Sequence, residues 1–153
     1  MALVLFLHLL GASIWVGGHL ILAIRFVPKA WRLRDASELL TFEHKYEPLG
    51  MTALGVQIAT GLHLAWAYSS DMAQWFDPYA APLHVIGYKL IALLLTALVA
   101  AHARFRVIPK LYRQPQGAGV RFFCLHVLMV TLLAVSFVYM GVAFRFGAVF
   151  GGV

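Results

Sequence analysis

The sequence predicts an all-α integral membrane protein: a four-transmembrane-helix, up-and-down bundle with both termini outside. Hydrophobic residues make up 62% of the 153 residues, charged residues 12%, and the mean hydropathy is +0.83, which lies outside the range of soluble domains. Four apolar segments are each long enough to cross about 30 Å of hydrocarbon. They cover residues 2–24, 49–68, 83–103 and 120–144, so we expect residues 1–153 to form a single transmembrane domain.

The positions of the basic residues predict the orientation. Nine of the twelve Lys and Arg residues lie either between the first and second segments or between the third and fourth, and Arg121 stands at the start of the fourth. The middle connection has no Lys or Arg and carries Asp71 and Asp77. The positive-inside rule therefore places the two basic connections in the cytoplasm. Topology and anionic membrane lipid account for these charges, and we expect no nucleic-acid partner.

The first apolar segment is interpreted as a retained helix rather than a signal peptide. No basic residue precedes its apolar run, and the run is longer than the apolar core of a signal peptide. The second helix is expected to begin near Ala36, because Asp35-Ala36-Ser37-Glu38 has the spacing of a helix start. Glu43, His44 and Glu47 then lie on a cytoplasmic extension, where their charged neighbours favour a solvated helix face over a metal site.

The middle connection and the fourth segment add two features. Trp75, Phe76 and Tyr79 make the connection an interfacial aromatic segment, which serves either as a membrane anchor or as a lid over an outward-facing site. The single cysteine, Cys124, lies inside the fourth helix, so it forms no intrachain disulfide and we expect a small core residue. The sequence shows no low-complexity tract and no clear internal repeat.

Histidines in the apolar segments are the main functional signal. Six of the seven lie within or at the ends of these segments, where an imidazole without a partner is costly. Matched by side of the membrane, the outer half holds His8, His63 and His84 together with Lys89, and the cytoplasmic half holds His19, His102 and His126. At about 100° per residue, His8 and His19 share one face of the first helix, and His84 and His102 share one face of the third.

Histidines on facing helices of a bundle are a recurrent way to hold haem iron. The rise of about 16 Å between His8 and His19 suits two stacked redox centres. The preferred outer ligands are His8 and His63, and the inner ligands are chosen among His19, His102 and His126. Lys89 is expected to contact a haem propionate or substrate, to reach outward to the interface, or to carry a proton. Each histidine also has a structural interpretation, as a hydrogen-bond partner between helices.

Two stretches of the sequence carry a resemblance to a known family. One is His8-Leu-Leu-Gly-Ala-Ser-Ile-Trp15-Val-Gly17-Gly18, and the other runs from Gly87-Tyr-Lys89 to His102-Ala-Arg-Phe-Arg106-Val-Ile-Pro109. They resemble the first-helix signature, and the lysine-bearing helix with its exit, of the CopD-type copper-resistance membrane proteins. The four-helix format, His8 and Lys89 are also similar to HemJ, a membrane protoporphyrinogen oxidase. Helix four departs from the HemJ pattern, because Phe123-Cys124-Leu125-His126 replaces an Asn-Glu-Pro-like motif.

These observations predict a CopD-like protein of the bacterial inner membrane that binds b-type haem, two per chain, through bis-histidine ligation and moves electrons. The first alternative, which the resemblance implies, is copper transport or resistance. With five methionines and no Met-x-x-Met or Cys-x-x-Cys pair, the histidines at both depths favour haem over a copper conduit. The second alternative is an oxidoreductase that acts on a porphyrinogen or quinol near Lys89. A redox partner or quinone, and a homodimer or a larger membrane complex, are the expected partners.

Overall fold

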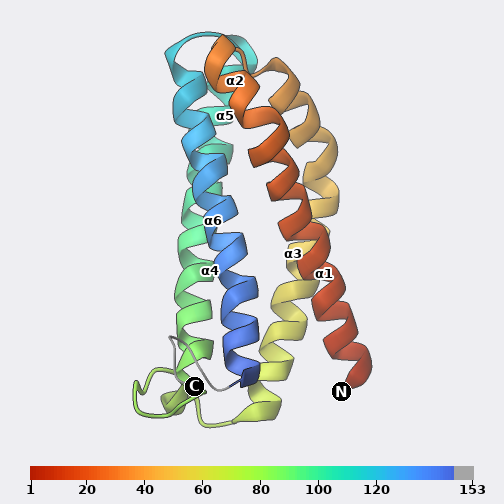
Figure 1. The fold of residues 1–153 in the computed structure, drawn as a ribbon, viewed down its shortest axis with the longest axis vertical. Helices are drawn as coiled ribbons and strands as arrows, with labels where there is room; N and C mark the ends of the chain where they lie inside the picture. The colour runs from red at the N-terminus through yellow and green to blue at the C-terminus, as the bar shows by residue number, and fades with distance from the viewer. Residues whose placement is uncertain (147–153) are drawn as a thin grey trace.

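The computed structural model, which describes residues 1–146, is all-helical and contains no β-strand in that range. The prediction of an all-α bundle is thereby confirmed. Four long rods lie side by side (Figure 1). Their segments are α1 (Ala2–Ile21), the π-helix η1 (Leu22–Phe26), α2 (Val27–Leu33), α3 (Ser37–Tyr68), the 3-10 helix η2 (Met72–Trp75), α4 (His84–His102), the π-helix η3 (Ala103–Val107), α5 (Ile108–Arg113) and α6 (Ala118–Phe146).

The rods extend beyond the predicted apolar segments, because two prolines do not end the helices. Proline lacks an N–H and its ring crowds the carbonyl four residues earlier, so it normally kinks or stops a helix. Here Pro28 and Pro109 each stand second in a new helix and follow a π-helical turn. In that turn the residue before the proline donates its N–H to the carbonyl five residues earlier, and the rod continues past the proline. The third rod begins at Ser37, whose N–H binds Asp35 Oδ1 at 2.9 Å, as the helix-start spacing predicted.

Three of the rods are long and apolar enough to cross a membrane: Ala2–Leu33, His84–Arg113 and Ala118–Phe146. The fourth predicted crossing, within α3, does not meet the same criterion, because Gln57, Thr60 and His63 lower the hydropathy of its apolar half. α3 nevertheless packs along α1 over much of its length. Many Leu, Ile and Phe side chains are exposed on the outside of the bundle, as expected where lipid replaces water.

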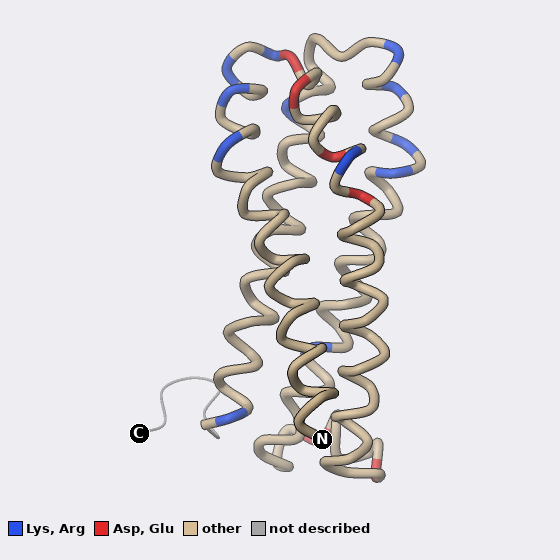
Figure 2. Tube along the Cα trace, turned by 90° about the vertical axis from the view of Figure 1, so that its right-hand side faces the viewer, with Lys and Arg blue, Asp and Glu red and all other residues tan. Residues whose placement is uncertain are grey.

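The ends of the bundle differ in charge. Lys and Arg gather where α2 and α5 lie, which we call the basic end (Figure 2). The N-terminus and the connection that contains η2 lie at the opposite end (Figure 1). In that connection Trp75 is buried against Ala65 and Ile86, and its indole N–H donates to the Ser69 carbonyl at 3.2 Å. Trp75 thus closes the bundle end, whereas Phe76 and Tyr79 are exposed.

The structure contains an internal repeat that the sequence analysis missed. Asp35 and Gln116, which are 81 residues apart, form an isolated bridge and a side-chain hydrogen bond of 3.1 Å. The backbone bonds around them are reciprocal: Ala36 N–H donates to Pro115 O at 2.8 Å, and Gly117 N–H donates to Arg34 O at 2.9 Å. Reciprocal bonds of this kind define a local twofold axis between the two helical hairpins.

The same offset of 81 residues relates the helices themselves. It carries η1 onto η3, Val27 at the start of α2 onto Ile108 at the start of α5, and Ser37 at the start of α3 onto Ala118 at the start of α6. The sequence Arg25-Phe-Val-Pro-Lys-Ala-Trp-Arg32 recurs as Arg106-Val-Ile-Pro-Lys-Leu-Tyr-Arg113. The bundle is therefore built from two hairpins with the same order of elements, each with a π-turn and a proline at the basic end.

Candidate functional site

His8 is held between α1 and α3 in one tautomer. Its Nδ1 lies 2.9 Å from Thr60 Oγ1, and the Thr60 hydroxyl donates to the Val56 carbonyl at 2.5 Å. Since the hydroxyl proton is engaged there, His8 Nδ1 carries the hydrogen and donates it. The ring edge lies against Gly61, and Gln57 donates to the His8 backbone carbonyl. Nε2 is left with an unprotonated lone pair.

His19 is oriented in the same way at the other end of α1. Its Nδ1 lies 2.8 Å from the Trp15 carbonyl, which can only accept, so Nδ1 carries the hydrogen and Nε2 keeps its lone pair. The imidazole lies edge-on to the Tyr46 ring, with centroids 6.0 Å apart. Thr131 on α6 donates to the His19 backbone carbonyl at 3.2 Å. His8 and His19 therefore both contact α3, which confirms that they share a face of α1.

His102 and His126 meet directly near the basic end. His126 Nδ1 donates to the Phe122 carbonyl at 2.8 Å, so His126 Nε2 accepts from His102 Nδ1, also at 2.8 Å. The two rings are stacked, with centroids 5.0 Å apart and planes inclined by 16°. We call these two hydrogen bonds in series the His102–His126 relay. In it, the nitrogen that keeps a free lone pair is His102 Nε2, and the His102 side chain is exposed. Of the three predicted inner histidines, the structure thus pairs two, and it holds His19 separately on α1.

Lys89 is a half-buried cation inside the opposite half of the bundle. It lies within electrostatic range of His8, and its Nζ lies close to Gly141 on α6. Among residues 1–146 it forms no hydrogen bond or ion pair. By the 81-residue offset, Lys89 occupies the position in the second hairpin that His8 occupies in the first.

The remaining histidines at this end are not brought to His8. His63 is exposed, and none of the described residues forms a hydrogen bond with its side chain. His84 contacts the Tyr88 ring at 5.4 Å between centroids, and its Nδ1 is buried without a hydrogen-bond partner in the described part of the chain. The expected outer pair, His8 with His63, is thus replaced by His8 with Thr60. Residues 1–146 contain no group of three or more His, Cys, Asp or Glu side chains placed to hold a metal ion.

A carboxylate cluster at the basic end was not foreseen as a buried feature. Glu43 and Glu47 are half-buried on α3, whereas His44 is exposed. Glu47 Oε1 pairs with Arg104 Nε at 3.2 Å and so joins α3 to η3. Glu43 Oε2 is buried with no hydrogen-bond partner among the described residues. Burial raises the pKa of Glu43, and the neighbouring Glu47 carboxylate raises it further, against the opposing effect of Arg104.

We expect Glu43→Gln to stabilise the protein more at about pH 8 than at about pH 5. Because the Glu43 pKa is raised in the folded state, the folded protein is most stable at low pH, where the carboxyl is neutral. Its free energy of unfolding falls as the pH rises through that pKa, because the buried group then ionises. Glutamine keeps the shape and removes the ionisation. Thermal unfolding in detergent across this pH range measures the effect. Glu38→Gln, an exposed carboxylate on the same helix, is the control; an equal change in both variants would contradict the prediction.

The fold and the site define an all-helical membrane protein with oriented histidines along its helices. Residues 40–145 match the family model described as Copper resistance protein D, CopD. This is more than half of the 153 residues, and the chain belongs to the CopD family. Membership places it among membrane proteins related to copper resistance. No curated protein and no solved structure matches the chain, and the similarity to HemJ stays an interpretation of the sequence.

Proposed function

We propose that this chain carries copper ions across the membrane through imidazole sites in a single four-helix transmembrane domain, with α3 as the fourth spanning helix. The supporting observation is the fixed tautomer of His8 and His19, which leaves Nε2 free on each. Imidazole nitrogen suits copper. Histidines that bind metals usually donate their other N–H to a carbonyl or another polar group, as both of these do.

The two sites would act in sequence along α1. His8 and His19 are eleven positions apart on the side that faces α3, which separates them by about 16 Å. Conduction requires sites that bind an ion strongly enough to accept it and weakly enough to release it. The exposed His102 Nε2, held by the His102–His126 relay, would receive or deliver the ion at the basic end.

Lys89 would control charge at the His8 site. A copper ion near His8 is repelled by the Lys89 ammonium while Nζ keeps its proton. Loss of that proton removes the repulsion and leaves Nζ as a neutral amine, which can act as a copper ligand. Copper entry at His8 is therefore expected to release a proton from Lys89, because metal ligands must be deprotonated.

The competing proposal from sequence is a haem b electron carrier, and the contacts at the histidines do not fit it. His8 binds Thr60 rather than a second imidazole. The rings of His102 and His126 touch each other, so no space for a porphyrin lies between them. No described contact favours a porphyrinogen or quinol oxidase either, and copper is the better supported substrate.

The test is copper binding and copper uptake by the purified protein. We expect the full-length chain to bind copper and to carry it into proteoliposomes. His8→Ala and His19→Ala should each lower the copper bound per chain and slow uptake, whereas His44→Ala, exposed outside the apolar half of α3, should match the parent. A b-type haem spectrum in the purified protein, with no copper bound, would overturn the proposal.

A further inference from the structure

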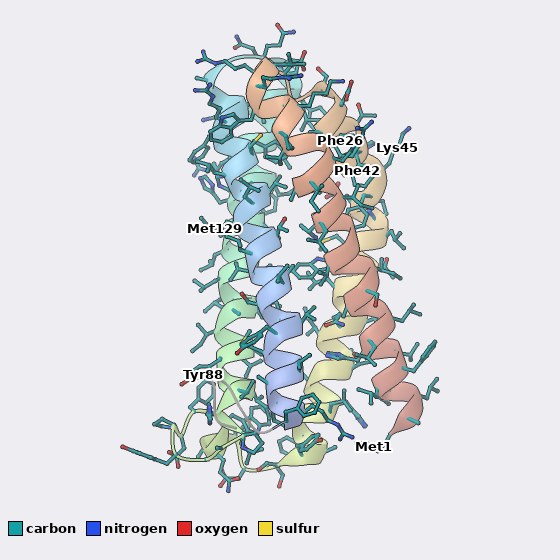
Figure 3. The ribbon with its side chains drawn as sticks, in the orientation of Figure 1. Met1, Phe26, Phe42, Lys45, Tyr88 and Met129 are labelled. Atoms are coloured by element: carbon teal, nitrogen blue, oxygen red, sulfur yellow. The ribbon has the colours of Figure 1, made fainter. Side chains whose placement is uncertain are left out.

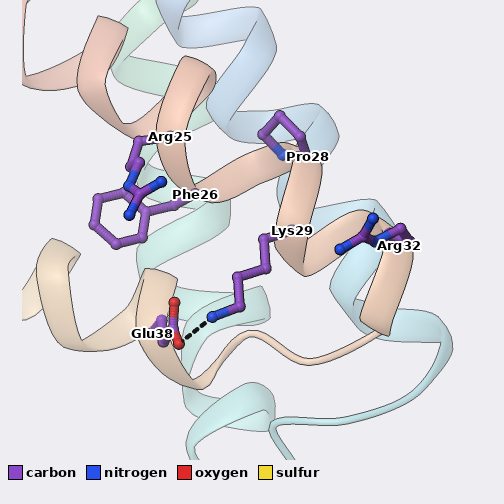
Figure 4. A pocket seen from close by; sticks show the side chains of 6 residues that line it. All are labelled: Arg25, Phe26, Pro28, Lys29, Arg32 and Glu38. Carbon is purple, nitrogen blue, oxygen red and sulfur yellow. Dashed lines mark hydrogen bonds and ion pairs between the residues drawn. The ribbon is translucent and has the colours of Figure 1, made fainter.

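An open hollow of about 580 Å³ lies at the basic end, between the end of the first rod and the start of α3. Figure 4 shows three basic side chains around it, together with Phe26, Pro28 and Glu38. Lys29 pairs with Glu38, and both side chains remain more than half exposed, at 51% and 61%. Arg25 and Arg32 form no ion pair within residues 1–146. The hollow therefore holds an excess of positive charge.

The three cations are spaced to act together. Arg25, in the π-turn η1, and Lys29 and Arg32, three residues apart on α2, all line the hollow. The hollow also has an apolar side, because Phe26 packs against Phe42 of α3, with ring centroids 4.9 Å apart and planes inclined by 32° (Figure 3). Guanidinium groups match the oxygens of a phosphate in geometry as well as charge. A phosphate group next to an apolar neighbour fits both sides of the hollow.

The second hairpin repeats this arrangement. Arg106, Lys110 and Arg113 have the same spacing and flank the equivalent proline: Arg106 lies in the π-turn η3, and Lys110 and Arg113 follow it on α5. Two triads in register are not required by the positive-inside rule, which counts charges and sets no helical spacing. Two lining positions differ between them: Phe26 is replaced by Val107, and Glu38 by Gly119, in the second hairpin. The first triad is therefore partly neutralised, and the second has no equivalent carboxylate.

The depth of the hollow selects a lipid over a soluble anion. Ile21 and Ile24, within the four residues before Arg25, are 50% and 72% exposed, as expected of side chains that face acyl chains. Arg25 is thus at the boundary between the apolar and charged parts of the rod, where lipid phosphates lie. Basic pockets at this boundary attract anionic headgroups.

The geometry points to a binding site for the phosphate of an anionic phospholipid in the hollow formed by Arg25, Lys29 and Arg32. The phosphate oxygens accept from the three cations, and the lipid backbone lies toward Phe26. Glu38 competes with the phosphate for Lys29 and so limits affinity.

Native mass spectrometry of the full-length protein in detergent tests the site, with phosphatidylglycerol, phosphatidylcholine and inorganic phosphate as separate probes. We expect phosphatidylglycerol to bind in preference to phosphatidylcholine, and millimolar inorganic phosphate not to displace it. Arg25→Gln with Arg32→Gln should weaken phosphatidylglycerol binding roughly tenfold or more, since each cation contributes about 1 kcal/mol. The matched control, Arg34→Gln with Lys45→Gln, removes two exposed charges outside the hollow and should bind as the parent does.

Glu38→Gln distinguishes loss of a specific lipid site from loss of folding. It should tighten phosphatidylglycerol binding several-fold by freeing Lys29, and a folding defect would not produce tighter binding. Equal weakening in the two double variants would overturn the site in favour of diffuse surface charge. Displacement of the lipid by inorganic phosphate, or equal binding of the two lipids, would overturn the assignment to a phospholipid. No change in the Arg25 and Arg32 variant would overturn it as well.

Discussion

Gly18→Leu should destabilise the bundle by about 3 kcal/mol or more, because the site is already filled. A Cβ on Gly18 would lie 2.0 Å from Tyr46 Cζ, closer than any real contact. The Tyr46 hydroxyl is anchored to α1, where it donates to the Ile14 and Trp15 carbonyls at 3.1 and 3.0 Å. The ring cannot move aside without breaking these bonds, so α1 and α3 must separate.

The neighbouring glycine provides the control. A Cβ on Gly17 meets no atom within 4 Å, so Gly17→Leu makes the same chemical change one residue away and should leave stability nearly unchanged. Thermal or denaturant unfolding in detergent gives the comparison. Tyr46→Ala added to Gly18→Leu should recover part of the loss, because it removes the clashing ring. Similar destabilisation by the two leucines would show that close packing at Gly18 is not the cause.

Thr60→Val should weaken copper binding at His8 by about 10- to 100-fold without removing a ligand. Thr60 Oγ1 accepts the His8 Nδ1 hydrogen, and valine keeps the branched shape while it lacks the acceptor. The imidazole is then free to rotate and to move its proton to Nε2, which blocks the lone pair that would bind copper. Thr60 is a positioning residue in this scheme.

The matched control for Thr60 lies on the same helix. The Thr52 hydroxyl donates to the Pro48 carbonyl at 2.8 Å on an exposed face, so Thr52→Val loses the same type of helix bond without touching His8. Copper titration gives the affinity, and imidazole nitrogen chemical shifts report which nitrogen of His8 is protonated. Unchanged shifts in Thr60→Val, or equal copper affinities in the two variants, would refute the positioning role.

Composition and apolar length were sufficient to predict the class and the four rods, because lipid requires long apolar helices. They could not predict the rod ends. Pro28 and Pro109 indicate helix ends in a sequence, and only the backbone shows that a π-turn carries the helix past each of them. The low hydropathy of α3 likewise reflects Gln57 and Thr60, whose polar groups are used against His8 rather than exposed to lipid.

The histidine partners were predictable only in part. Helical rotation places His8 and His19 on one face of α1, and the structure agrees. Which helices become neighbours is a tertiary property, so neither the His102–His126 contact nor the His8–Thr60 bond followed from spacing. The internal repeat did leave a signal in the sequence: the pattern Arg-x-x-Pro-Lys-x-aromatic-Arg begins at both Arg25 and Arg106.

The reciprocal bonds around Asp35 and Gln116 have the form of an isologous contact, in which each side donates one backbone hydrogen bond and accepts the equivalent one from the other side. The chain is thus organised like a symmetric homodimer whose two copies are joined in one polypeptide. True identical subunits would carry the same residue at both equivalent positions. Fusion releases the copies from that constraint, and it lets one keep the neutral donor His8 while the other keeps the cation Lys89.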